Sequence, residues 1–68
     1  MKKKTIFDEY VASEITLCNG EHYTQYSWVC GNLKDKNIVI NRLQELGCSI
    51  TDIFTEERDG YYFIRIYN

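Results

Sequence analysis

The chain has 68 residues, of which 44 % are hydrophobic and 15 % aromatic, and it contains no proline. This size and composition predict a single globular domain spanning residues 1–68, near the lower limit for a self-sufficient core, and exclude a disordered chain. With Lys2, Lys3 and Lys4 set aside, the formal net charge falls from −2 to −5, which disfavours direct binding to nucleic acid and favours a partner with a basic surface.

The N-terminal segment, residues 1–6, is basic and is expected to be frayed. It lacks the apolar h-region of a signal peptide, and no apolar run approaches the roughly 20 residues that cross a membrane. The three cysteines are an odd number, which fits free thiols in a reducing compartment. We therefore expect a cytoplasmic protein that makes no membrane contact.

Residues 9–18 alternate between apolar and polar side chains, and residues 21–30 form a second extended run. Between them lies Asn19-Gly20, the dipeptide that best tolerates the two positive φ angles of a type I′ turn. A two-residue loop there pairs Val11 with Trp28 and turns Glu14 to the opposite side. The register gathers these apolar side chains on one face of the hairpin: Val11, Ile15, Leu17, Tyr26 and Trp28.

Residues 32–47 carry the signals of a helix. Asn32 can cap its N-terminus, Asp35 lies in the first turn, where a negative charge is favourable, and Gly47 can supply the left-handed residue after its end. Apolar residues at helical spacing predict the stripe that lies on the sheet: Leu33, Val39, Ile40, Leu43 and Leu46.

The extended runs on either side of Asp59-Gly60 predict a second hairpin. A two-residue loop there pairs Phe54 with Arg65, and it extends the pairing back to Asp52 and Tyr67. The whole chain then reads as an α+β fold, ββαββ: a four-stranded, mainly antiparallel sheet with one helix packed on one face. The pattern does not decide the order of the strands.

The outer face of the last hairpin, turned away from the helix, is rich in aromatic and arginine side chains. Such residues stabilise a thin sheet as cross-strand partners, and they are also concentrated at the centres of protein interfaces. A continuous aromatic patch left in water on so small a protein favours a contact surface, for a partner or for a second copy in a homodimer. The candidate partner-binding residues are Asp52, Phe54, Glu56, Arg58, Tyr61, Phe63, Arg65, Tyr67, Glu14 and Glu21.

Single-stranded nucleic acid is an alternative ligand for this face. The pattern Tyr61-x-Phe63-x-Arg65 resembles the stacking strand of RNA-recognition motifs, on which unpaired bases stack. No glycine-bearing basic motif precedes it, however, and the βαββαβ order is not met. Carboxylates at Asp52 and Glu56 would also lie beside the phosphates.

Cys18, His22, Cys30 and Cys48 are residue types that bind zinc, but their spacing is not of the CxxC kind. Cys18 and Cys30 lie at opposite ends of the first hairpin, on the order of 30 Å apart. No nucleophile is placed beside a base and an orienting group. We expect no metal, no cofactor, no catalytic residue and no enzymatic activity.

The stretch INRLQELGCSITDIFTEERDGYYFIRIY resembles the second part of an ACT-type regulatory domain, with a helix, a glycine, a strand, a turn and a strand. It covers under half of the chain and lacks the second helix. The resemblance implies an alternative function, the sensing of an amino acid or another small ligand, with sheets paired between subunits.

In size, acidic composition and layout, though through no shared motif, the chain resembles phage-encoded anti-CRISPR proteins and similar anti-defence inhibitors. This resemblance implies an inhibitor that docks on a larger nucleic-acid-handling complex, such as a CRISPR effector, in the host cytoplasm and blocks it by occlusion. Tyr61, Phe63 and Tyr67 would supply apolar anchors, and the acidic groups would meet basic residues of the partner. This is the function that we predict.

Overall fold

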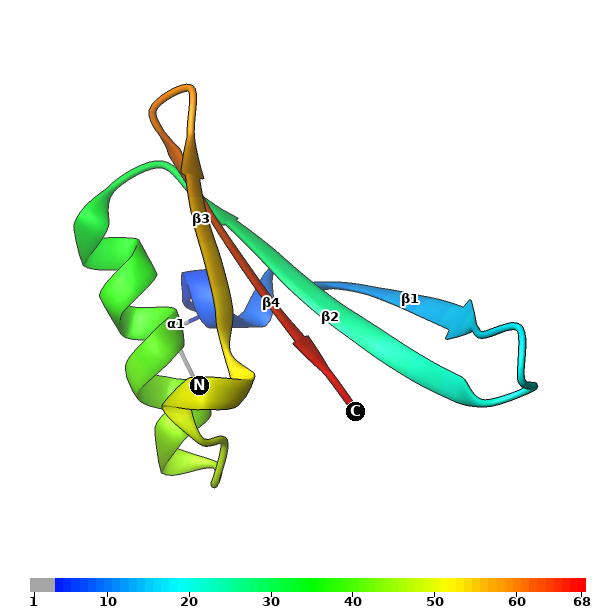
Figure 1. The fold of residues 1–68 in the computed structure, drawn as a ribbon. Coiled ribbons are helices and arrows are strands. Elements are labelled where there is room, and N and C mark those ends of the chain that lie inside the picture. Colours follow the sequence, from blue (N-terminus) through cyan, green and yellow to red (C-terminus); the bar gives the residue numbers. More distant parts are fainter. Residues whose placement is uncertain (1–3) are drawn as a thin grey trace.

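The computed structural model describes residues 4–68 (Figure 1). Within these residues the elements, with η for a 3-10 turn, are η1 (Ile6–Asp8), β1 (Val11–Thr16), β2 (His22–Cys30), α1 (Leu33–Glu45), η2 (Ile50–Asp52), β3 (Phe54–Arg58) and β4 (Tyr61–Tyr67). The strands form one antiparallel sheet in the order β1-β2-β4-β3. The predicted α+β fold and its ββαββ order are confirmed, and the structure supplies the strand order.

A short 3-10 turn precedes the first strand and packs against the core. Met1, Lys2 and Lys3, part of the segment expected to be frayed, lie outside the described residues. Residues 6–8 form η1, whose start is capped by the Asp8 carboxylate. Because Ile6 packs against the core, the expected fraying does not extend to this residue.

The ends of α1 are those that the sequence predicts. The side chain of Asn32 accepts a hydrogen bond from the Asp35 N–H at 2.8 Å. Gly47 adopts a φ of 101°, and the N–H groups of Gly47 and Cys48 donate to carbonyls of the last turn. These two bonds form a Schellman motif, which ends the helix and returns the chain to the sheet.

The apolar stripe of α1 is shorter than predicted. Val39 and Leu43 are buried and Ile40 is half-buried. Leu33 and Leu46, which the prediction included, are 52 % and 60 % exposed. A straight helix meets a twisted sheet best near its middle, so its terminal residues remain outside the core.

The second hairpin has the predicted register, with Phe54 opposite Arg65 and a tight turn at Asp59 and Gly60, both of positive φ. The strand β3 begins at Phe54, however, because the preceding segment forms η2, where the Ser49 side chain accepts a hydrogen bond from a backbone N–H. The predicted pairing of Asp52 with Tyr67 is therefore wrong, since Asp52 lies in η2.

The first hairpin pairs in a register one residue away from the predicted one. Val11 lies opposite Ser27 rather than Trp28. Because side chains alternate along a strand, this shift turns every side chain of β1 to the other face of the sheet. The prediction that Val11 and Ile15 share a face with Trp28, while Glu14 faces away, is therefore wrong.

The turn of the first hairpin explains this shift. The loop has three residues, 18–20, and is closed by the Leu17 N–H, which donates to the Glu21 carbonyl at 2.8 Å. Gly20 has a φ of 88°, whereas a type I′ turn requires a positive φ at Asn19 as well. The side chain of Asn19 instead accepts a hydrogen bond from the Glu21 N–H at 3.0 Å, which stabilises the longer loop.

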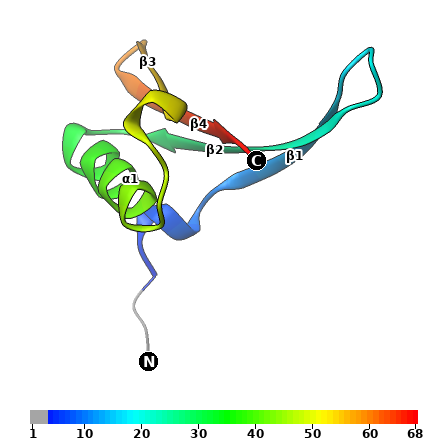
Figure 2. The ribbon, with the colours of Figure 1, turned by 60° about the horizontal axis from the view of Figure 1, so that its bottom comes forward.

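The core lies between α1 and one face of the sheet, and its buried residues are Trp28, Cys30, Val39, Leu43, Ile53 and Ile64. Phe7 of η1 stacks on Trp28 at 5.5 Å, and its carbonyl accepts a hydrogen bond from Trp28 Nε1 at 2.9 Å. Tyr10 packs against Tyr26, so the shifted register places Tyr10 on the helix side in place of Val11. Figure 2 shows α1 and η1 on the same side of the sheet, with the β1–β2 hairpin extending past both.

Candidate functional site

The side of the sheet turned away from α1, called the outer face, is not covered by any element within residues 4–68 (Figure 2). Each strand places every second side chain on it. The strands β1 and β2 contribute Val11, Ser13, Ile15, Tyr23, Gln25, Ser27 and Val29. The strands β4 and β3 contribute Tyr61, Phe63, Arg65, Tyr67, Phe54, Glu56 and Arg58.

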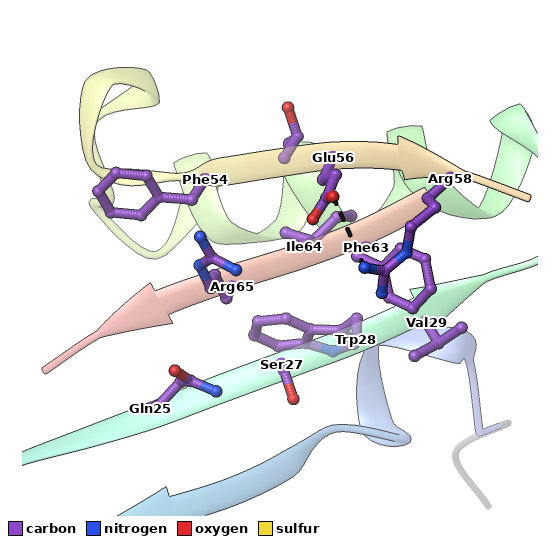
Figure 3. Close-up of a pocket in the computed structure, with 11 residues that line it drawn as sticks. Gln25, Ser27, Trp28, Val29, Phe54, Glu56, Arg58, Phe63, Ile64 and Arg65 are labelled. Carbon is purple, nitrogen blue, oxygen red and sulfur yellow. Dashed lines mark ion pairs between the residues drawn. The ribbon is translucent and has the colours of Figure 1, made fainter. Parts of the chain in front are cut away.

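Two arginines lie against aromatic rings of the outer face (Figure 3). The guanidinium carbon of Arg58 is 4.9 Å from the centre of the Phe63 ring, and that of Arg65 is 5.9 Å from the centre of the Phe54 ring. Phe54 also meets Tyr67 edge to face, with the ring centres 5.7 Å apart. Exposed cation–π contacts are worth about 0.5–1 kcal/mol each, and here they hold the long arginine side chains in place. The surface is thus partly preorganised for binding.

A hollow of about 160 Å³ lies among these side chains, over β2, β4 and β3 (Figure 3). Gln25, Ser27 and Arg65 contribute polar atoms to its lining, while Phe54 and Phe63 contribute aromatic rings. Pockets for drug-sized ligands start at about 300 Å³. The hollow is therefore better matched to one side chain of a docking protein than to a metabolite.

The charge of the outer face differs from that of the whole chain. Arg58 and Arg65 are positive, and Glu56 is the carboxylate that the strand registers place on this face within residues 4–68. Glu56 lies 3.9 Å from Arg58, whereas Arg65 makes no ion pair with any described residue. Around the hollow, two positive charges thus lie near one negative charge, while a second carboxylate, that of Glu21, lies at the hairpin end of this face, where it accepts a hydrogen bond from the Tyr23 hydroxyl.

The structure brings most of the predicted partner-binding residues together on the outer face, namely Phe54, Glu56, Arg58, Tyr61, Phe63, Arg65 and Tyr67. Two of the other predicted acidic residues, Asp52 and Glu14, do not join them, and a third, Glu21, lies only at the hairpin end of this face. Asp52 lies in η2 and lines a hollow beside the end of α1. Glu14 lies opposite Thr24 on the helix side, because of the register shift. Glu21 lies at the tip of the first hairpin, next to its loop.

Four apolar residues of the outer face are absent from the predicted set of partner-binding residues. All four come from the first hairpin: Val11, Ile15, Tyr23 and Val29. Val11 and Val29 are 62 % and 54 % exposed. A three-residue loop with a left-handed glycine in third position is the next most common hairpin connection after the two-residue loop. Testing that loop at residues 18–20 would have turned Val11 and Ile15 outward.

The surroundings of Tyr23 and Cys30 raise the pKa values of both side chains. The Tyr23 hydroxyl donates a hydrogen bond to the Glu21 carboxylate, and this bond, followed by desolvation, raises the pKa of Tyr23. Burial, followed by the negative charge of Asp35, raises the pKa of the Cys30 thiol. Both groups therefore stay protonated at neutral pH.

Within residues 4–68 no three His, Cys, Asp or Glu side chains lie close enough together to hold a metal ion. Cys18, Cys30 and Cys48 are free thiols. Among the described residues, none of the helices combines the length and the apolar character needed to span a membrane.

No protein-family model, no curated protein and no solved structure matches the chain.

Proposed function

We propose that this chain is a non-enzymatic protein-binding module that docks on a larger partner through the outer face. The observation that carries the proposal is a set of aromatic and arginine side chains that are braced against one another and exposed on one face. Phe54, Tyr61 and Tyr67 are 47 %, 51 % and 44 % exposed. Aromatic residues and arginine are enriched at interface centres, and so much aromatic surface in water is unusual for a small protein.

Arg65 lies at the centre of this surface, between Ser27 of β2 and Phe54 of β3. Docking would take its guanidinium out of water, and a buried charge without a partner is costly. The partner must therefore present an acceptor, such as a carboxylate or a backbone carbonyl, opposite Arg65. This group would make Arg65 the hydrogen-bonding centre among apolar anchors.

In its most specific form the proposed function is inhibition by occlusion. A flat docking face can act by covering the working surface of the partner. The resemblance in size and layout to anti-CRISPR proteins supports a target among nucleic-acid-handling complexes in the cytoplasm, such as a CRISPR effector. The acidic body, left in solution after docking, would repel nucleic acid from the covered surface.

Direct binding of single-stranded nucleic acid is a second candidate, favoured by the stacking of Arg58 on Phe63 and of Arg65 on Phe54. Bases stack on exposed rings, and arginines neutralise phosphates. Asp52 lies off the strands of this face, which removes one carboxylate that we expected beside the phosphates. The acidic net charge of the chain still opposes this candidate.

The test is affinity capture from a bacterial lysate, with and without nuclease, using the wild type and two variants. Phe63→Ala/Tyr67→Ala removes two rings of the outer face, and Leu33→Ala removes a side chain of similar exposure from α1 as a control. We expect a nuclease-resistant protein to be captured by the wild type and by Leu33→Ala but lost from the double variant. Circular dichroism of each variant checks that the fold is kept.

Each alternative has its own outcome. Material that disappears on nuclease treatment, with affinity falling steeply as salt rises, would favour nucleic acid. Self-association that is lost in the double variant would favour a homodimer through the outer face. Heat stabilisation by a metabolite would favour the ACT-like sensor. A captured protein that the double variant retains would contradict docking through this face.

A further inference from the structure

The two edge strands of the sheet, β1 and β3, differ in how well their edges are protected. The strand β3 has five residues, of which Glu56, Glu57 and Arg58 are charged. Charged side chains on an edge strand oppose its pairing with another chain. The strand β1 has six residues, of which only Glu14 is charged, and its pairing with β2 is continuous. The edge of β1 is therefore the one open to a further strand.

The hydrogen bonds of the first hairpin show which backbone groups of β1 are free. The Leu17 N–H donates to the Glu21 carbonyl at 2.8 Å, and on the other side of β2 Thr24 exchanges hydrogen bonds with Asn68. Because bonded pairs alternate along an antiparallel ladder, every second residue before Leu17 also bonds to β2. The residues between them direct their N–H and C=O groups away from the sheet: Ala12, Glu14 and Thr16.

The space beside this edge is open. Within the described residues, β2 is the only strand next to β1. The β1–β2 hairpin extends past both α1 and η1 (Figure 2), so a strand added along residues 12–16 would not meet either of them. Val11 is 62 % exposed, and Ile15 is the half-buried member of an otherwise exposed strand. The strand thus leaves both backbone groups and apolar side chains for a partner.

We propose that β1 pairs with β1 of a second copy of this chain, antiparallel and two-fold symmetric about Ser13. The pairing joins the two sheets into one through their edges. Val11 lies opposite Ile15 of the second copy on the outer face, and Glu14 lies opposite Ala12 of the second copy on the helix side. Each Ala12–Glu14 pair exchanges both of its backbone hydrogen bonds, which satisfies groups that are free in the single chain.

The side chains of β1 complement themselves in this register. A two-fold interface brings the same surface of both copies together, so each strand must match its own reversed sequence. Symmetry about Glu14 would set two carboxylates directly opposite each other, which is destabilising. Symmetry about Ser13 separates them and makes Val11 and Ile15 a non-hydrogen-bonded pair, in which side chains approach most closely. The occupant that β1 fits is thus a second β1.

The interface lies at an edge of the sheet and not on the outer face, so the proposal stands whether or not the outer face binds a protein. Pairing through one short strand buries little surface, and small interfaces form weak, exchanging complexes. We therefore expect a dimer that dissociates on dilution.

Sedimentation equilibrium of the reduced, full-length protein from about 10 μM to about 1 mM tests this. We expect the mass to rise with concentration from the 8.1 kDa of the single chain toward twice that value. A mass that stays at the single-chain value up to about 1 mM would overturn the proposal.

Two proline variants locate the interface. Glu14→Pro removes an N–H from the free edge of β1 and keeps the ladder to β2, because proline is tolerated where the N–H faces outward. Glu57→Pro removes the same charge and an outward N–H from β3, since the Arg58–Tyr61 pair closes the turn beside it. We expect Glu14→Pro to weaken self-association at least about tenfold and Glu57→Pro to leave it unchanged. Equal effects would contradict pairing through β1, and circular dichroism checks both folds.

Cross-linking tests the register without proline. In a Cys18→Ser/Cys48→Ser background, Ser13→Cys would face its own copy with Cα atoms about 4.5 Å apart, within the span of a disulfide. We expect mild oxidation to link this variant into dimers and to leave Thr55→Cys, exposed on β3, as single chains. Equal linking of the two would overturn the proposal. Phe63→Ala/Tyr67→Ala should self-associate as the wild type does, and loss of the dimer there but not in Glu14→Pro would assign it to the outer face instead.

Discussion

The three cysteines occupy three different environments, and these should decide their reactivity. Cys18 is exposed in the hairpin loop, Cys48 is half-buried behind α1, and Cys30 is buried in the core. A thiol reacts as its thiolate, and burial together with the charge of Asp35 raises the pKa of Cys30. The structure thus separates one inert core thiol from two thiols that reagents can reach.

We therefore expect iodoacetamide to modify Cys18 first, Cys48 more slowly and Cys30 only after unfolding. Intact-mass time courses with peptide mapping, in native buffer and in denaturant, measure the three rates. If Cys30 reacted as fast as Cys18 in native buffer, its burial in the core would be contradicted.

Tyr23 offers a second test at the scale of one residue. Its hydroxyl donates to the Glu21 carboxylate, which favours the protonated phenol and raises the pKa of Tyr23. Glu21→Ala removes this acceptor and its charge, so the pKa of Tyr23 should fall toward the ordinary value for tyrosine. An NMR titration of the tyrosine rings measures it, with Glu57→Ala as the control. A Tyr23 pKa that is the same in both variants would contradict the contact.

At the scale of the element, the two hairpins show when the residues of a turn are enough to predict the register of the strands and when they are not. Asp59 and Gly60 both accept positive φ angles, and the predicted register of the second hairpin is confirmed. The dipeptide Asn19-Gly20 suggests the same turn, yet only the glycine has a positive φ among residues 18–20. The same turn chemistry is compatible with two loop lengths, and a difference of one residue decides which face β1 presents.

From the conformation of the first hairpin loop, we expect alanine substitutions at two glycines to have different effects on the free energy of unfolding. Gly20 has a φ of 88°, whereas Gly31 has no positive φ, and an added Cβ would meet no atom at either position. Gly20→Ala should lower the free energy of unfolding by about 1–2 kcal/mol, from backbone strain alone. Gly31→Ala should change it by less than about 0.5 kcal/mol. Urea unfolding measures both, and equal effects would contradict the left-handed conformation of Gly20.

The docking of η1 makes a further prediction. Phe7 stacks on Trp28 and its carbonyl accepts the indole hydrogen bond. Phe7→Ala should cost about 2 kcal/mol of stability, less than for a fully buried phenylalanine, and should shift the emission of Trp28 to longer wavelength as water reaches the ring. Phe54→Ala, on the exposed outer face, should leave the emission unchanged. An unchanged emission in Phe7→Ala would show that η1 does not cover Trp28.

At the scale of the whole molecule, the protein is a thin four-stranded sheet with one short helix on one side. The radius of gyration is 12.9 Å, above the roughly 11 Å typical of a compact chain of this length. One short helix shields one part of one face, while the β1–β2 hairpin extends beyond it (Figure 1). Such a shape buries few residues and leaves aromatic rings exposed to solvent.

The sequence by itself determined the elements whose signals are local. The caps of α1 at Asn32 and Gly47, the turn at Asp59-Gly60 and the alternation in β4 involve neighbours in the chain, and they predicted the ββαββ order and most of the aromatic face. Tertiary structure decided the strand order and which of the two possible loop lengths the first hairpin takes, and with the loop length the register of β1 and the removal of Glu14 from the outer face. These depend on contacts between distant residues, such as Tyr10 against Tyr26, whose energies outweigh small differences between alternative turns.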